Sequence, residues 1–158
     1  MIKKTIPAVL FLILSVRLFG ETGLEITVEE NNGSITIKKS KGTAKTLVIP
    51  DAINGMPVTV IGDRAFTRRD LTELTIPDSV TIIGEGAFSF NRLTSVRIGS
   101  GVTSIGRGAF MGNRLADVTI GGSVREIGRG AFSGNEISSL VIPEGLTLID
   151  DYAFFGNR

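Results

Sequence analysis

A period of 22 residues runs from about residue 61 to the end of this 158-residue chain. Six apolar columns keep the period, and the most regular is a phenylalanine that follows an alanine in every unit. This column consists of Phe66, Phe88, Phe110, Phe132 and Phe154. A repeat of this length is one structural unit, which buries its apolar residues only against its neighbours. The sequence therefore predicts a solenoid.

Each unit also predicts one short strand. In one unit the apolar residues recur as Leu93, Val96 and Ile98, and the last two alternate with outward positions. Every unit runs in the same direction, so the strands must be parallel and about 4.8 Å apart. Stacking turns the apolar columns into core stripes, in which each buried phenylalanine contributes about 1.5 to 3 kcal/mol.

Glycine and asparagine form three further columns. The first glycine column consists of Gly62, Gly84, Gly106 and Gly128, followed by Asp150. We expect left-handed backbone there, because glycine and aspartate tolerate it. The second consists of Gly86, Gly108 and Gly130, with Arg64 and Tyr152 at its ends, and is attributed to close packing. The amides of Asn91, Asn113, Asn135 and Asn157 are expected to cap neighbouring backbone groups.

These units resemble a known family. The segments from Leu71 to Phe88 and from Asn91 to Val96 are similar to BspA-type bacterial leucine-rich repeats, which also occur in treponemal proteins. The segment from Ile49 to Gly62 is similar too, with five extra residues. The resemblance covers about residues 44–158, or about five repeats. It implies a curved, β-rich solenoid with a parallel sheet on the concave face and short strands or 3-10 turns on the convex face. It also implies protein binding at a cell surface, including host proteins for some members.

The N-terminal third predicts a signal peptide and a cap. Residues 1–20 combine a positive start at Lys3 and Lys4 with an apolar run that is too short to span a bilayer. Export to the cell surface, periplasm or medium is therefore expected, with membrane contact only through the signal peptide. Within residues 21–43, two segments in which apolar and polar residues alternate flank Asn31-Asn32-Gly33. This pattern predicts a β-hairpin that covers the first unit.

The sequence contains no comparable cap at its other end. Asn157-Arg158 ends just before the next leucine of the period is due, so the last rung is expected to expose apolar residues. Truncation, stacking on another chain and a tolerated bare end all fit this pattern. Self-association through the last rung is accordingly one of the predicted partner interactions.

Composition restricts the chemistry. The chain has no cysteine and no histidine, which removes disulfides, thiolate metal sites and the histidine-based nucleophile systems. Loss of residues 1–20 would leave 14 basic and 16 acidic residues, so no basic footprint for nucleic acid remains. We expect no cofactor, metal or catalytic residue. A carboxylate-based, glycan-active enzyme is a weaker alternative. It would use Glu73 and Asp117, two rungs and thus about 10 Å apart.

The sequence predicts two binding surfaces for a protein, such as a host matrix or bacterial envelope protein. On the strands, outward positions fall at Glu73, Thr75, Ser95, Arg97, Asp117, Thr119, Ser139 and Val141. In the loop after Ala-Phe, Phe90 replaces a glycine, and Met111 and Phe155 replace serines. These departures indicate either a contact strip or local packing. Charged columns that include Glu85 and Arg107 are interpreted as solvated faces. Besides adhesin-like binding, a structural segment of a larger array without its own ligand stays open.

Overall fold

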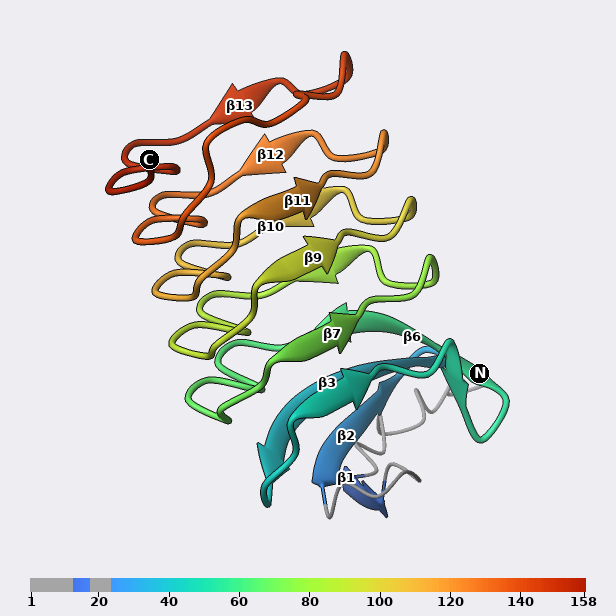
Figure 1. Cartoon of the computed structure of the whole chain (residues 1–158). Helices are drawn as coiled ribbons and strands as arrows, with labels where there is room; N and C mark the ends of the chain where they lie inside the picture. The colour runs from blue at the N-terminus through green and yellow to red at the C-terminus, as the bar shows by residue number, and fades with distance from the viewer. Residues whose placement is uncertain (1–12, 18–23) are drawn as a thin grey trace, which may run out of the picture.

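The computed structural model of the protein describes residues 13–17, as backbone, and residues 24–158. Successive coils stack along one axis and carry two sheets, whose repeated strands are parallel, on two of their sides (Figure 1). The described residues contain no helix, and thus none long enough to cross a membrane. The predicted β-rich solenoid is confirmed.

The first sheet contains one strand from each of four units. Its strands are β4 (Thr46–Val48), β7 (Glu73–Thr75), β9 (Ser95–Arg97) and β11 (Asp117–Thr119), in the order β11-β9-β7-β4. All three pairings are parallel, and Val118 lies opposite Val96, one period earlier. This is the sheet that the sequence predicts on the concave face. We call the outward side of β7, β9 and β11 the strand face.

The second sheet contains the short strands predicted on the opposite side. Its repeated strands are β6 (Met56–Ile61), β8 (Ile82–Ile83), β10 (Ser104–Ile105), β12 (Glu126–Ile127) and β13 (Leu148–Ile149), all parallel. The five extra residues of the first unit form a small hairpin, in which β5 (Ala52–Ile53) pairs antiparallel with β6. Asn54 and Gly55 turn it with φ values of 52° and 77°.

A hairpin extends the second sheet at its N-terminal end, as predicted. β2 (Glu25–Asn31) and β3 (Ser34–Lys41) pair antiparallel, and β3 pairs parallel with β6. Leu24, Ile26 and Ile37 are buried, so the hairpin continues the core. A further strand, β1 (Ile13–Arg17), pairs antiparallel with β2 and falls within the predicted signal segment. The rest of that segment lies outside the described residues, and the signal peptide stays a prediction.

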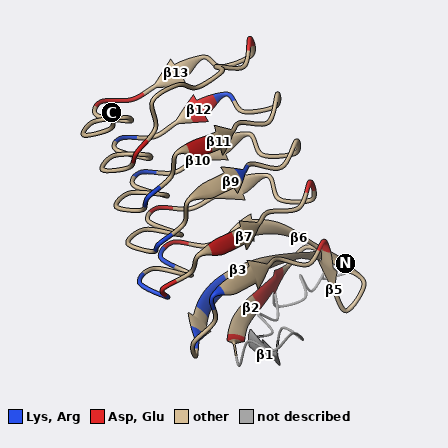
Figure 2. Cartoon of the chain, viewed as in Figure 1, with Lys and Arg blue, Asp and Glu red and all other residues tan. Residues whose placement is uncertain are grey.

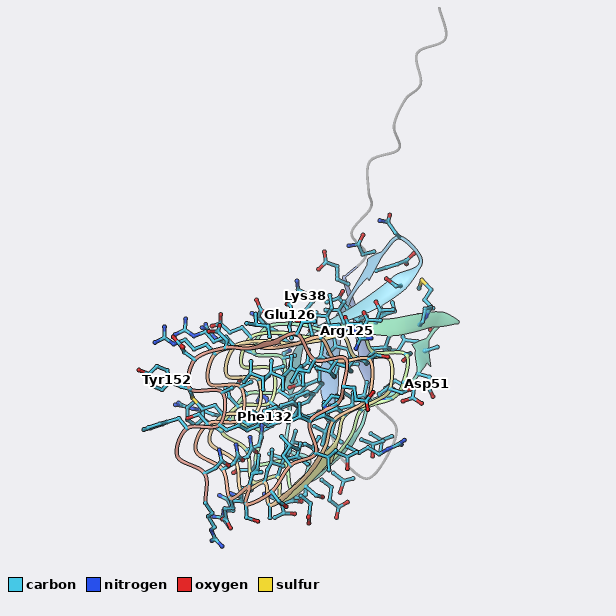
Figure 3. The ribbon with its side chains drawn as sticks, turned by 90° about the horizontal axis from the view of Figure 1, so that it is seen from above. Lys38, Asp51, Arg125, Glu126, Phe132 and Tyr152 are labelled. Carbon is cyan, nitrogen blue, oxygen red and sulfur yellow. The ribbon has the colours of Figure 1, made fainter. Side chains whose placement is uncertain are left out.

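The phenylalanine column forms a continuous stack. Neighbouring rings lie 5.4, 5.4, 5.2 and 5.4 Å apart from Phe66 to Phe154, and their planes differ by at most 15°. The first four rings are completely buried. In the view along the axis, Phe132 lies inside the coils (Figure 3). Each ring packs on its equivalents in the neighbouring units, which couples the units energetically.

The asparagine column is a hydrogen-bonded ladder. The amide nitrogen of Asn113 donates to the carbonyl oxygens of Phe88 and Phe110, both at 3.0 Å, and its oxygen accepts from Leu93 N at 3.2 Å. Asn91, Asn135 and Asn157 make the equivalent bonds in their own units. In the first unit Arg69 takes the column's place and donates to Ser40. The predicted capping role is confirmed.

The prediction for the glycine columns is wrong, because the two roles are exchanged. The left-handed positions are in the second column, where φ is 58° at Gly108 and 59° at both Gly86 and Tyr152. In the first column, a Cβ on Gly106 would lie 2.7 Å from the carbonyl carbon of Gly84. Close backbone approach between units therefore leaves no room for a side chain at the four glycines of the first column, although Asp150 occupies its last position. Turn geometry explains the second column.

Candidate binding surfaces

The strand face is regular and polar. Glu73, Thr75, Ser95, Arg97, Asp117 and Thr119 are all exposed, as predicted. Thr75, Arg97 and Thr119 lie in one row across the three strands. Glu73 accepts a hydrogen bond at 3.0 Å from the Thr46 hydroxyl, which ties its carboxylate to the first unit. The structure thus brings six of the eight predicted strand residues onto one surface.

A loop that follows β7 contains Asp78. The Asp78 carboxylate accepts a hydrogen bond at 2.6 Å from Ser100 N. Hydrogen bonds from the backbone and side chain of Ser100 lower the pKa of Asp78. Desolvation raises this pKa, and the positive charge of Arg97 lowers it by a smaller amount. Arg97 itself forms no ion pair within residues 24–158, and its charge has the weakest of these effects on the Asp78 pKa.

Ser139 and Val141 do not join the strand face. Residues 139–141 form no strand, and Val141 is 86% exposed. Our prediction of a fifth strand in the first sheet is therefore wrong. Ile142 is 45% exposed, whereas its equivalents Ile98 and Ile120 are 1% and 9% exposed, so little apolar burial holds the segment against β11. A groove of about 420 Å³ separates residues 139–143 from residues 116–120. We call it the β11 groove.

The loops after Ala-Phe form the second surface, the loop edge, on the left in Figures 1 and 2. Phe90 is 47% exposed with φ at 55°, where later units have glycine. Its ring lies over Gly112, since a Cβ there would be 2.7 Å from the ring, and the Arg68 guanidinium lies 5.1 Å from its centroid. Phe90 therefore makes local contacts and still presents half of its surface to solvent.

Met111 adjoins Phe90, whereas Phe155 belongs to a different patch. A groove of about 320 Å³ on the loop edge is lined by Arg64, Glu85, Gly86, Ser89, Phe90, Arg107, Gly108 and Met111. We call it the loop-edge groove. Phe155 instead packs edge-on against Tyr152, with centroids 5.8 Å apart. Tyr152 projects outside the coils in Figure 3 and is covered by Arg129 at 5.4 Å. The three loop residues do not form one continuous strip.

Acidic and basic residues are intermixed along the loop edge (Figure 2). Three ion pairs link neighbouring units: Arg64 with Glu85 at 3.1 Å, Arg92 with Asp70 at 3.0 Å, and Arg158 with Glu136 at 3.0 Å. Such exposed pairs contribute little to stability. Arg107 is exposed in the loop-edge groove and forms no ion pair within residues 24–158. Its guanidinium is available to an anionic group beside an aromatic ring.

The alternative of a carboxylate-based, glycan-active enzyme depends on Glu73 and Asp117. Glu73 and Asp117 are exposed on strands that β9 separates. No group of three acidic side chains within the described ranges is placed to hold a metal ion. The spacing of these two carboxylates is the one observation that favours an enzyme. The absence of enzymatic activity stays a prediction.

Apolar residues of the last rung are partly exposed. Ile142, Leu148 and Ile149 are 45%, 50% and 47% exposed, and Phe154 is half-buried. A groove of about 350 Å³ lies against this rung, between residues 137–142 and 154–158. The rung thus offers apolar surface to a further layer.

Solved structures of bacterial leucine-rich repeat proteins are similar to this chain. A leucine-rich repeat protein of T. pallidum aligns with a TM-score of 0.70 at 24% identity, over 88% of this chain and 67% of that one. A leucine-rich repeat protein from Bacteroides capillosus aligns with a TM-score of 0.52 at 22% identity, over 91% of this chain and 92% of that one. A third, from Eubacterium ventriosum, aligns with a TM-score of 0.52 at 26% identity, over 87% of this chain and 34% of that one. No curated protein matches the chain significantly.

The family comparison agrees with the geometry. Six copies of the BspA type leucine rich repeat region match residues 41–158. This range contains both sheets' repeated strands, the phenylalanine stack and the asparagine ladder. The 22-residue columns, the parallel sheets and this match lead to one conclusion: the chain belongs to the BspA-type leucine-rich repeat family.

Proposed function

We propose that this chain is an exported protein-interaction module that binds its partner through the loop-edge groove. The observation that carries the proposal is the backbone of Phe90. A bulky residue in left-handed backbone costs about 1 to 2 kcal/mol, and later units have glycine at this position. The fold does not require the aromatic ring there, so a function for its exposed half accounts for its presence.

The chemistry of the groove fits a protein partner. Aromatic and arginine side chains dominate the binding energy of protein interfaces. Phe90 and Met111 offer apolar contact, and Arg107 offers a charge-assisted hydrogen bond to a carboxylate. The partner segment is therefore expected to carry an acidic residue next to an apolar one. The polar strand face supplies weaker contacts that add through avidity.

The proposed setting is the cell surface, the periplasm or the medium, with a host matrix protein or a bacterial envelope protein as partner. Residues 1–20, read as a signal peptide, support export. Membership of the family supports an interaction role. Adhesion is a function that agrees with both export and an interaction role.

Capture experiments on matched variants test this proposal. The immobilised chain is incubated with matrix and envelope extracts, and bound proteins are identified and titrated. Phe90→Gly and Arg107→Ala should each weaken capture at least tenfold, which corresponds to about 1.4 kcal/mol. Arg97→Ala on the strand face should change it less than threefold. Binding at the loop edge would be refuted if Phe90→Gly captures as much protein as the unmodified chain, or if the unmodified chain captures no protein from either extract.

Two other functions give different results. If the chain is a structural segment that stacks through its last rung, then its apparent mass will rise with concentration in sedimentation velocity experiments. The exposed Ile142 and Ile149 support this second candidate, and Ile149→Lys should abolish the rise. A glycan-active enzyme would show turnover that Glu73→Ala removes.

A further inference from the structure

The fifth unit stays joined to the fourth on two sides and separates from it on the third. On the second sheet, β13 pairs with β12, and Thr147 N donates to Arg125 O at 2.8 Å. At the loop edge, Phe132 N donates to Ala153 O at 2.8 Å. Only on the strand face do the two units part, at the β11 groove. The groove is thus an opening within the solenoid and is separate from its last rung.

Both walls of the β11 groove contain unpaired backbone groups. In the earlier units, Ile49 N donates to Thr75 O at 3.1 Å and Ile98 N donates to Thr119 O at 2.8 Å. The equivalent donor is Ile120 N, directly after β11, and the equivalent acceptor is Val141 O. This bond is not formed in the described chain, and residues 138–142 make no other backbone hydrogen bond to β11. The outer edge of β11 therefore lacks a partner strand.

The side chains around the groove define what would fit there. Val118, Ile120 and Leu140 line it with apolar surface, and Asp117 is its one charged lining residue. Backbone donors and acceptors repeat along both walls, so a bound segment meets polar groups on each side and apolar groups below. An extended peptide supplies this pattern, since its backbone bonds lie in the sheet and alternate side chains point inward.

We propose that the β11 groove accepts an extended segment of a partner protein, which adds to β11 as a further strand. The segment carries aliphatic residues at alternate positions, which replace the missing contact between Val118, Ile120 and Leu140. The five residues from 116 to 120 span about 16 Å, which matches a short strand. The site is independent of the loop-edge groove, and it holds whether or not that groove binds a protein.

A peptide copied from the chain itself is the probe. Residues 113–122, as a blocked synthetic peptide, contain β11, which already pairs in the required register with β9. Binding to the intact chain is measured by fluorescence anisotropy, and amide hydrogen exchange follows Ile120 N. Binding should protect this amide, and N-methylation of alternate peptide amides should weaken binding at least tenfold, about 1.4 kcal/mol.

A disulfide that closes the groove provides the matched control. The sequence has no cysteine, so within one chain the Thr119→Cys and Val141→Cys thiols can bond only to each other. This bond forms when the walls of the groove approach to a Cα separation of about 4.4 to 6.8 Å, and it holds the groove closed. Oxidation should abolish peptide binding, and reduction should restore it. The control pair, Arg97→Cys with Thr119→Cys, links positions that already lie opposite each other in the sheet, and it should bind the peptide in both states.

Three results would overturn the proposal. The first is equal binding of the N-methylated peptide, which would show that backbone pairing is not involved. The second is unchanged binding by the oxidised Thr119–Val141 variant. The third is an Ile120 amide that is as protected as Ile98 in the free chain, because the groove would then be closed in solution.

Discussion

Replacement of Asn113 by alanine tests whether the asparagine ladder holds the units together. The side chain makes three hydrogen bonds, to Phe88 O, Phe110 O and Leu93 N. The two carbonyls keep a second donor, from Asn91 and Asn135 respectively. Leu93 is fully buried, and its N–H has no other partner within the described residues. The substitution therefore leaves one orphaned donor and weakens the pairing of two acceptors.

The expected loss follows from these contacts. A buried donor without a partner costs about 1 to 3 kcal/mol, and each lost bond to a carbonyl that keeps a partner costs about 0.5 to 1.5 kcal/mol. Together the free energy of unfolding should fall by about 2 to 6 kcal/mol. In a domain of ordinary stability, this is a large part of the total.

Urea unfolding followed by far-ultraviolet circular dichroism measures the effect. Asn157→Ala is the matched control, because Asn157 makes the same three kinds of bond but is half-buried, so water can replace them. Its loss should be less than half that of Asn113→Ala. The dependence of the free energy on urea should be unchanged, which shows that both variants unfold from the same compact state. A loss below about 1 kcal/mol for Asn113→Ala would refute the structural role that we assign to the ladder.

Three further substitutions test separate points. Gly106→Ala places a Cβ 2.7 Å from the backbone of Gly84, so it should destabilise the chain by about 1 to 3 kcal/mol in the same urea assay, and an unchanged midpoint would contradict the close approach. Phe90→Gly relieves left-handed backbone but loses ring contacts, so its stability should change by less than about 1 kcal/mol; a loss above 3 kcal/mol would make Phe90 a core residue. Asp78 has a pKa below its ordinary value of 3.8, so its stabilising hydrogen bond to Ser100 is intact above about pH 4 and is lost as the pH falls toward the lowered pKa. Asp78→Asn should accordingly flatten the acid limb of the plot of unfolding free energy against pH, and an unaltered limb would exclude this linkage.

The candidate site was only partly predictable. Phe90 and Met111 stand out in the sequence because they depart from their columns, and the structure places both in the loop-edge groove. Arg107 does not stand out in the sequence, because its column carries a charge in every unit and is interpreted as a solvated face. In the sequence, Tyr152 stands out only as a replacement for glycine, although its ring pairs with Phe155. Each of these contacts joins positions that are not equivalent in the repeat, so no column reports them.

The sequence by itself determined the solenoid, its parallel strands, the phenylalanine stack and the asparagine ladder. In each of these features a residue meets its own equivalent in the next unit, so a spatial contact becomes a 22-residue period. Tertiary structure alone decided the two glycine roles, the hairpin of β5 and β6 and the opening beside β11. These depend on the distance between backbones and on how much apolar surface each unit can bury. Ile98 and Ile142 occupy equivalent positions in the sequence, yet one is 1% exposed and the other 45%.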